Sequence, residues 1–332
     1  HIGIDIGSTT VKIAVLNHAK QCLHACYVRH YTDIRQKVWD LLQNAYEIFG
    51  DRQITMAITG SGGIALADYL HIPFLQEVIA GTKAVRTYYP QSDVIIELGG
   101  EDAKITYLTG GNEHRMNGNC AGGTGAFIDQ MATLLKMGAE EMDKAAQTAE
   151  KTYTIAARCG VFAKSDIQPL INQGAKSADI AKSIYQAVVN QTIAGLAQGR
   201  PIKGHVLYLG GPLTFSKCLR QSFDETLGVT GTCPENSLLF VALGAAFYAE
   251  ESWDLLKTAE LLEQRGMSET YRSQPPLFEN QAEYDAFKAH HAKAAVPQAD
   301  FPTDYAKPVH IGIDSGSTTV KVAVIDENAE LL

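Results

Sequence analysis

Short apolar runs alternate with longer segments of helical spacing through residues 1–252. The apolar runs predict buried β-strands at residues 54–58, 94–98 and 205–209. Apolar positions three and four apart predict helices at residues 35–49, 76–88, 126–135, 180–196 and 213–227. Alternating strands and helices are typical of an α/β fold, in which helices cover the faces of a sheet. The pattern therefore predicts the α/β class for this part of the chain.

One short unit occurs twice. Residues 1–17 read HIGIDIGSTTVKIAVLN, and residues 310–326 read HIGIDSGSTTVKVAVID. A repeat this close indicates duplication. Each copy predicts a β-hairpin in which two apolar strands flank a Gly-Ser-Thr-Thr turn. We expect the intact polypeptide to hold two related domains in tandem, and this chain to be a fragment with the first domain and the opening hairpin of the second.

The chain accordingly divides into three segments. Residues 1–252 form the first domain, and residues 309–332 are the truncated start of the second. Residues 253–308 are polar and partly helical in pattern, and several prolines interrupt them: Pro275, Pro276, Pro297, Pro302 and Pro308. This composition is typical of a linker.

Composition limits the kinds of binding partner and the cellular compartment that we expect for this protein. The 332 residues carry a formal net charge of −9, which disfavours broad binding to nucleic acid or to an anionic membrane. No apolar run approaches the roughly 20 residues of a bilayer-spanning helix, and no leader-like segment opens the chain. We expect a cytoplasmic protein. Its six cysteines are too sparse for a disulfide scaffold, so thiols or metal ligands are the expected use.

The first of three glycine-rich turns follows Asp5. Its free amides and small hydroxyl side chains could hold a phosphate, and Asp5 at the strand end could hold a hydrated Mg²⁺. The candidate nucleotide contacts in this turn are Gly7, Ser8, Thr9, Thr10 and Lys12. For one copy alone, a hairpin whose glycine and serine only satisfy turn geometry is an equally good interpretation.

Two further turns follow predicted strands. The second contains Gly99 and Gly100 as candidate nucleotide contacts, and Glu101 and Asp102, which with Asp5 are candidate catalytic carboxylates. The third consists of Gly210, Gly211 and Pro212, where the glycines permit close approach of a ring or ribose.

Other nucleotide motifs fit poorly. No GxxxxGK[ST] sequence is present, which argues against a P-loop ATPase. Residues 60–65 read GSGGIA, close to a dinucleotide fingerprint, but Glu77 is too near to be its ribose-binding acid. We expect a plain strand-to-helix turn there.

Two cysteines lie in loops that precede predicted helices. Cys120 is followed by Gly123, Thr124 and Gly125, which are further candidate cofactor contacts, and Cys159 comes 39 positions after Cys120. A helix N-terminus stabilises a thiolate through its dipole and free amides. Two thiolates cannot complete a four-cysteine [4Fe–4S] set, so a second subunit or domain must supply the others. The remaining cysteines are expected to be inert: Cys22, Cys26, Cys218 and Cys233.

Taken in order, the three turns resemble the nucleotide segments of the superfamily that contains acetate kinase, sugar kinases, actin and the heat-shock chaperone ATPases. The resemblance implies two ribonuclease-H-like halves around a nucleotide cleft. The segments MNGNCAGGTGAFIDQMA, IAARCGVFAKSDIQPLINQG, LGGPLTF and ALGAAFYA are in addition similar to motifs of the 2-hydroxyglutaryl-CoA dehydratase activators and benzoyl-CoA reductase ATPase subunits, the BadF-BadG-BcrA-BcrD family. The repeat is similar to the long tandem-domain branch of that family.

This resemblance implies an ATPase with ATP or ADP, Mg²⁺ and a [4Fe–4S] cluster that two protomers share. Cys120 and Cys159 fall on the positions that ligate the cluster in the family. ATP hydrolysis would drive a low-potential electron from the cluster to a 2-hydroxyacyl-CoA dehydratase or a related reductase, after a ferredoxin- or flavodoxin-like donor has reduced it. The protein would act as a homodimer, or its first domain would pair with the second tandem domain.

Three residues depart from the family pattern. Glu101 stands where the small activators often have glutamine, Ala126 where they often have arginine, and Lys164 where they often have glutamate. These departures concern the nucleotide contacts and the choice of partner. One alternative function is a carbohydrate or small-metabolite kinase, because the same nucleotide motifs serve phosphoryl transfer. A second alternative is a noncatalytic sensor or scaffold that uses the nucleotide only as a switch.

Overall fold

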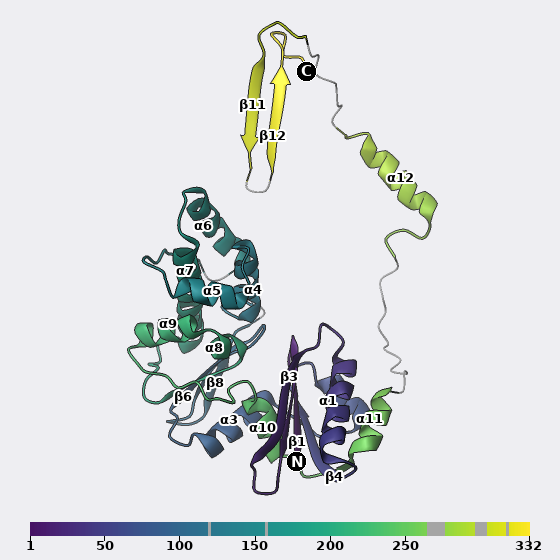
Figure 1. The fold of residues 1–332 in the computed structure, drawn as a ribbon, viewed down its shortest axis with the longest axis vertical. Helices are drawn as coiled ribbons and strands as arrows, with labels where there is room; N and C mark the ends of the chain where they lie inside the picture. The colour runs from purple at the N-terminus through teal and green to yellow at the C-terminus, as the bar shows by residue number, and fades with distance from the viewer. Residues whose placement is uncertain (119–120, 157–158, 264–275, 296–303, 317–318) are drawn as a thin grey trace. The chain divides into compact units, whose positions relative to one another are not determined.

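The computed structural model describes residues 1–118, 121–156, 159–263, 276–295, 304–316 and 319–332. It divides into two compact units, His1–Arg265 and Gly266–Leu332. The first unit contains two β-sheets with helices packed on both faces of each (Figure 1). Within the described ranges, no helix is long and apolar enough to cross a membrane.

The first sheet is built around the N-terminal hairpin. Its strand order is β10-β4-β1-β2-β3, with β5 paired to β4. β1 pairs antiparallel with β2 and parallel with β4, so it lies inside the sheet and is buried along its whole length. The strands are β1 (Ile2–Ile6), β2 (Thr10–Leu16), β3 (Cys22–Arg29), β4 (Gln53–Thr59), β5 (Phe74–Leu75) and β10 (Ser252–Asp254).

The two-residue period of β1 gives this sheet two different faces. Ile2, Ile4 and Ile6 point to one face and share a buried cluster with three helices. These helices are α1 (Ile34–Phe49), α2 (Ile64–Leu70) and α11 (Leu255–Glu263). Gly3 points to the opposite face, where it meets the backbone of α10 (Phe240–Phe247).

The second sheet repeats the core of the first. Its order is β8-β7-β6-β9, in which β6 pairs antiparallel with β7 and parallel with β9. The strands are β6 (Val94–Leu98), β7 (Ala103–Tyr107), β8 (Glu113–Met116) and β9 (Val206–Leu209). Helices α3 (Glu77–Tyr88) and α10 join the sheets, because Ala84 and Ala242 share one buried cluster with Leu16 of β2 and Ile95 of β6.

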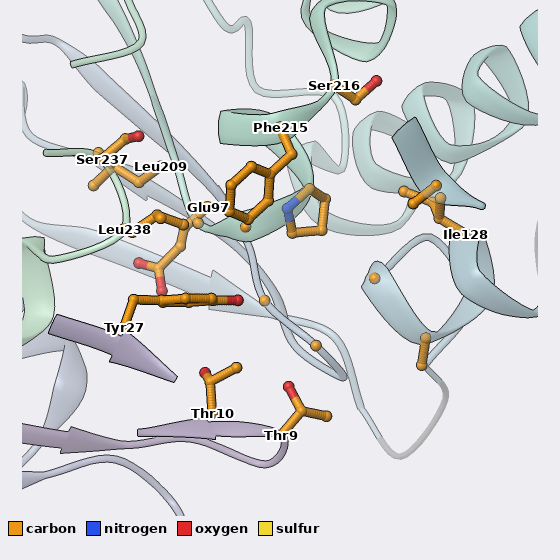
Figure 2. Close-up of a pocket in the computed structure, with 18 of the residues that line it drawn as sticks. Thr9, Thr10, Tyr27, Glu97, Ile128, Leu209, Phe215, Ser216, Ser237 and Leu238 are labelled. Atoms are coloured by element: carbon orange, nitrogen blue, oxygen red, sulfur yellow. The ribbon is translucent and has the colours of Figure 1, made fainter. Parts of the chain in front are cut away.

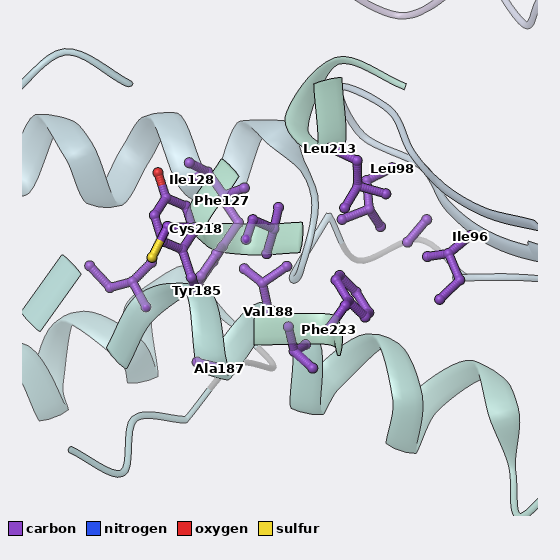
Figure 3. Packing of buried hydrophobic residues seen from close by; sticks show 14 of the residues in the cluster. Ile96, Leu98, Phe127, Ile128, Tyr185, Ala187, Val188, Leu213, Cys218 and Phe223 are labelled. Atoms are coloured by element: carbon purple, nitrogen blue, oxygen red, sulfur yellow. The ribbon is translucent and has the colours of Figure 1, made fainter. Parts of the chain in front are cut away.

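The opposite face of the second sheet carries the largest buried cluster. Figure 3 shows Tyr185 and Val188 packed with Phe127, Phe223 and Cys218 beside Leu98 of the sheet. The helices that contribute are α4 (Gly125–Leu134), α5 (Ala139–Ala146), α6 (Gly160–Asn172), α7 (Ser177–Thr192), α8 (Gly211–Phe215) and α9 (Lys217–Leu227). Burial of Cys218 in this core agrees with the structural role expected from the sequence.

Two of the predicted helices differ from the helices observed in the structure. The helix expected over residues 213–227 is broken at Ser216 into α8 and α9. Buried Asp143 stabilises the break, because its Oδ1 accepts hydrogen bonds from Ser216 Oγ at 2.5 Å and from the Cys218 N–H at 3.0 Å. The helix expected over residues 180–196 ends at Thr192 and continues as a π-helical turn, Ile193–Ala197.

The first unit extends beyond residue 252, where the sequence placed the start of the linker. β10 pairs antiparallel with β4, and α11 contributes Leu255, Ala259 and Leu262 to the cluster on the first sheet. The second unit contains α12 (Gln281–Ala292) and the hairpin of β11 (His310–Ser315) with β12 (Val320–Ile325). Both hairpins that the repeat predicted are therefore present.

The packing of α10 against α3 supplies a stability test. A Cβ on Gly244 would overlap the carbonyl of Ala80, whereas a Cβ on Gly81 of α3 would meet only Val241 Cγ2, at an ordinary 3.7 Å. We expect Gly244→Ala to lower the free energy of unfolding by about 1–3 kcal/mol, because close-packed backbones must separate. Gly81→Ala is the matched control and should be neutral or slightly stabilising. Urea unfolding measures both variants, and equal effects would contradict the packing described.

Candidate functional site

A cleft of about 600 Å³ opens between the two sheets of the first unit. Figure 2 shows Thr9 and Thr10 on one side and Phe215 on the other, with Tyr27 and Glu97 lining the space between. All three glycine-rich turns reach this cleft. The sequence-predicted residues that line it are Asp5, Thr9, Thr10, Lys12, Gly99, Gly100, Gly125, Gly210, Gly211 and Pro212.

The first turn, residues 7–10, is closed by a hydrogen bond from the Gly7 N–H to the Thr10 carbonyl at 2.9 Å. Lys12 Nζ lies 2.8 Å from Asp5 Oδ2 across the hairpin, and Asp5 is only 4% exposed. Burial alone would lower the pKa of Lys12, but the Asp5 carboxylate outweighs it and the pKa is raised. Lys12 is therefore a fixed positive charge at the cleft. Gly7 and Ser8 belong to the same turn but are not among the residues that line the cleft, and their role as phosphate contacts stays a prediction.

The second turn, residues 99–102, packs directly on the first. A Cβ on Gly100 would lie 2.7 Å from Thr9 Oγ1 and 3.1 Å from Ser8 Oγ, so only glycine allows this approach. The turn is closed by the Gly99 N–H, which donates to the Asp102 carbonyl at 2.7 Å. Glu101 and Asp102 are absent from the residues that line the cleft, and Glu97 of β6 lines it instead.

A buried lysine connects the acidic residues behind this turn. Lys104 of β7 forms an ion pair with Glu77 of α3, lies 3.5 Å from Glu97, and lies 3.7 Å from Asp102. Glu77 Oε1 also accepts a hydrogen bond at 2.9 Å from the Ser61 N–H, in the turn between β4 and α2. Glu77 therefore links the turn after β4 of the first sheet to β7 of the second sheet.

The network moves three pKa values away from their ordinary ranges. Burial alone would lower the pKa of Lys104, but Glu97 and Glu77 raise it overall. Burial alone would raise the pKa of Glu77, but Lys104 holds it below its usual value. For Glu97, burial dominates over Lys104 and raises the pKa. Glu97 therefore gains a proton more readily than a glutamate in water.

The third turn supplies an aromatic slot. Gly210 has φ +87°, and a Cβ there would overlap the Leu98 carbonyl, so the turn lies against β6. A Cβ on Gly211 would have Tyr27 Oη at 3.5 Å and Phe215 Cε2 at 3.9 Å. The rings of Tyr27 and Phe215 form an edge-to-face pair with centroids 6.1 Å apart. The spacing of these residues in the sequence gave no sign that they would meet.

The loop after Cys120 joins the second turn to α4. The N–H groups of Gly125 and Ala126 donate to the carbonyls of Gly99 and Gly100, at 3.0 and 2.8 Å. Thr124 is fully buried and donates from Oγ1 to the Ala121 carbonyl at 2.6 Å. Gly123 has φ +82° and packs against Gln191. Gly123 and Thr124 therefore shape the loop, and Gly125 is the member of the three that lines the cleft.

Cys159 is the N-cap residue of α6 and is half-buried. Its carbonyl accepts from the Ala163 N–H at 2.9 Å, so its side chain lies at a helix N-terminus as expected. Cys120 lies outside the described residues. Among the described residues, no group of three or more His, Cys, Asp and Glu side chains could hold a metal ion. Burial raises the pKa of the Cys218 thiol, which disfavours a ligand role for this residue.

The fold and cleft define a mixed α/β protein of the actin-like ATPase class. Residues 2–249 match the model of the BadF/BadG/BcrA/BcrD ATPase family. The chain belongs to this family, and it is an ATPase.

Individual relatives agree with this assignment. The (R)-2-hydroxyglutaryl-CoA dehydratase activating ATPase of Acidaminococcus fermentans is 29% identical over 253 residues, which cover 75% of this chain and 96% of that protein. The crystal structure of component A of that organism's dehydratase has a TM-score of 0.67 at 27% identity, and the match covers 78% of this chain and 98% of that one. The Clostridium difficile 2-hydroxyisocaproyl-CoA dehydratase activator with bound ADPNP also has a TM-score of 0.67, at 24% identity, with coverage of 80% and 98%.

The lysine network predicts a large stability effect. We expect Lys104→Met to lower the free energy of unfolding by about 3–5 kcal/mol near neutral pH, because it leaves Glu77 and Glu97 without their cation. The stability that Glu77 contributes through its lowered pKa is present above its unfolded pKa and is lost as pH falls through the folded value. The deficit of the variant relative to wild type should therefore shrink on acidification.

Lys144→Met is the control for this prediction. Lys144 pairs with Glu140 at 2.6 Å on the exposed surface of α5, where solvent screens the pair and loss of the lysine should have no measurable effect. Urea unfolding at several pH values distinguishes the variants. A Lys104→Met deficit that is independent of pH would contradict the network.

Proposed function

We propose that this ATPase is an activator that passes an electron at low potential to a 2-hydroxyacyl-CoA dehydratase or related reductase. The observation that carries the proposal is the combination of a three-turn cleft with a cysteine at a helix N-terminus in one α/β unit. Relatives that match this unit over nearly their whole length are named as dehydratase activators.

ATP or ADP with Mg²⁺ would occupy the cleft. The N–H groups of the first and second turns and the fixed charge of Lys12 suit phosphates, which bind at amide-rich turns. Asp5 would hold Mg²⁺ through water, since Mg²⁺ keeps several waters and needs few carboxylates. The base or ribose would lie beside Gly211, against the Tyr27–Phe215 ring pair. We retain Glu101 and Asp102 as candidate catalytic carboxylates, and add Glu97 because it lines the cleft.

Cys120 and Cys159 would provide two ligands of a [4Fe–4S] cluster, and a second copy or domain would provide two more. The position of Cys159 fits this group, because a helix N-terminus favours a thiolate and an anionic cluster. When bound, the cluster would supply one electron at low potential. A ferredoxin- or flavodoxin-like donor would restore that electron.

The surface beside Cys159 suits a subunit contact. Val161 and Phe162 in the first turn of α6 are 68% and 65% exposed. Apolar side chains at this position would be covered if two copies paired around Cys159. A homodimer of isologous type would achieve this, because each copy presents the same surface to the other.

Pairing with a second tandem domain is the other arrangement that the chain supports. The β11–β12 hairpin keeps the register of β1–β2, since Ile311 pairs with Val324 as Ile2 pairs with Val15. Lys321 lies 2.9 Å from Asp314, and the Gly316 N–H donates to the Thr319 carbonyl at 2.9 Å, as in the first copy. We propose that this hairpin is the start of a second ATPase domain, preceded by a linker that ends near residue 308.

The cluster assignment is tested by iron content. Cys159→Ser should reduce iron and sulfide after anaerobic reconstitution to below about a tenth of the wild-type amount, because a cluster is held poorly without its thiolates. Cys22→Ser is the matched control, since Cys22 is exposed on β3 and should not affect iron. Iron and sulfide contents in Cys159→Ser equal to those of wild type would contradict the assignment of Cys159 as a cluster ligand. A calorimetric titration with Mg-ATP checks that the variant keeps its nucleotide cleft.

A further inference from the structure

His30 lies directly behind the first turn, between β3 and α1. It is 5% exposed and does not line the cleft. Its backbone N–H donates to the Thr9 carbonyl at 3.2 Å, and its ring Nε2 lies 3.2 Å from the Gly7 carbonyl oxygen. One residue from a neighbouring loop thus contacts the first turn at two places.

The partners of the ring determine its tautomer. The backbone N–H of Thr32, which can only donate, lies 3.0 Å from Nδ1, so Nδ1 is an acceptor. A carbonyl oxygen can only accept, so Nε2 carries the proton and donates to Gly7. The neutral ring with hydrogen on Nε2 satisfies both bonds at once. A proton on Nδ1 would place two donors face to face and break the bond to Thr32.

The bond to Gly7 fixes a peptide plane. In a trans peptide the carbonyl and the following N–H point in opposite directions, so holding the Gly7 carbonyl toward His30 fixes the direction of the Ser8 N–H. Rotation of this plane would exchange an N–H for a carbonyl oxygen on one side of the turn. A phosphate is attracted by the first and repelled by the second. The orientation of this one peptide therefore affects whether the turn can bind an anion.

The loop that holds His30 is strained. Tyr31 and Thr32 have φ values of +48° and +72°, a region that a β-branched residue such as Thr32 rarely adopts. The Thr32 N–H bond to the ring and the Asp33 N–H bond to the His30 carbonyl at 2.8 Å hold this bend. Asp33 then caps α1 by accepting from the Gln36 N–H. Strained backbone persists where surrounding contacts enforce it, and it is concentrated at functional sites.

We propose that His30 is a positioning residue of the nucleotide site, which holds the first turn in its anion-binding orientation through the Gly7 carbonyl. The proposal rests on the nucleotide cleft of the proposed function. It adds that affinity for the phosphates depends on a residue that does not touch them.

The two ring bonds can be tested separately. The side-chain amide of glutamine places its nitrogen near the imidazole Nε2, whereas the asparagine side chain ends near Nδ1. His30→Gln therefore keeps a donor for Gly7, and His30→Asn does not. We expect His30→Asn to raise the KM for Mg-ATP about tenfold with kcat within about twofold of wild type, and His30→Gln to keep a near wild-type KM.

Tyr31→Ala is the control. Tyr31 is 79% exposed, so this change alters the tip of the loop without touching the ring bonds, and it should leave KM unchanged. A wild-type KM in His30→Asn would overturn the proposal, as would equal losses in His30→Gln and His30→Asn. If the wild-type chain itself binds no Mg-ATP in calorimetry, the nucleotide cleft is what fails.

A measurement on the wild-type chain does not depend on the folding of any variant. Long-range proton–nitrogen NMR spectra of histidine-labelled protein distinguish the two neutral tautomers and the charged ring. We expect the His30 ring to carry its hydrogen on Nε2, and its Nε2 resonance to shift when ADP is added. Hydrogen on Nδ1, or a resonance that ADP leaves unchanged, would contradict the proposed role. The signal is assigned by its loss in His30→Gln.

Discussion

The contact between the first and second turns is the constraint on which the rest of the first unit depends. Gly100 approaches Thr9 and Ser8 so closely that a Cβ could not be accommodated without movement. This contact brings the ends of β1 and β6 together, although the two strands belong to different sheets. The cleft, the slot beside Gly211 and the start of α4 are all placed relative to that junction.

The ion pair between Glu77 and Lys104 also stabilises this junction. Glu77 accepts a hydrogen bond from the Ser61 N–H next to the first sheet and forms an ion pair with Lys104 of the second sheet. Separating the two sheets would leave these buried charges unpaired, which costs free energy. The carbonyls of Gly99 and Gly100 then accept the first N–H groups of α4. Rotation of one sheet relative to the other would therefore disturb the second turn, α4 and the lysine network together.

Much of this fold could be predicted from the sequence, because its signals are local. The hairpins, strands 94–98 and 205–209, and the helix after Cys159 all follow from apolar periodicity or glycine-rich turns. The break at Ser216 could not be predicted, since it depends on Asp143, which lies far away in the sequence. The pairing of β10 with β4 beyond residue 252 could not be predicted either, because it joins positions far apart in the sequence.

Only part of the candidate site could be predicted, because the sequence shows local patterns and not contacts between distant residues. The three turns can be recognised in the sequence by their glycines, but the residues that connect the turns come from separate helices and strands. From the sequence, Glu77 is only a poorly spaced candidate for a ribose ligand, whereas in the structure it contacts residues next to both sheets. The contact between Tyr27 and Phe215 could not be predicted, because no sequence pattern relates two aromatic residues so far apart in the chain. His30 also required the structure, since its function rests on which atoms face its two ring nitrogens.

The central claim is that the cleft at the junction of the three turns binds Mg-ATP. Calorimetric titration of wild type, Gly211→Ala and Gly211→Val tests it most directly. A single methyl group on Gly211 fits beside Tyr27 and Phe215, and we expect the two further methyl groups of valine to crowd the space next to these rings. We expect one Mg-ATP per chain, an affinity within about threefold of wild type for the alanine variant, and at least about tenfold weaker binding for the valine variant. Absence of binding to the folded wild-type chain, or equal affinity in all three proteins, would contradict it.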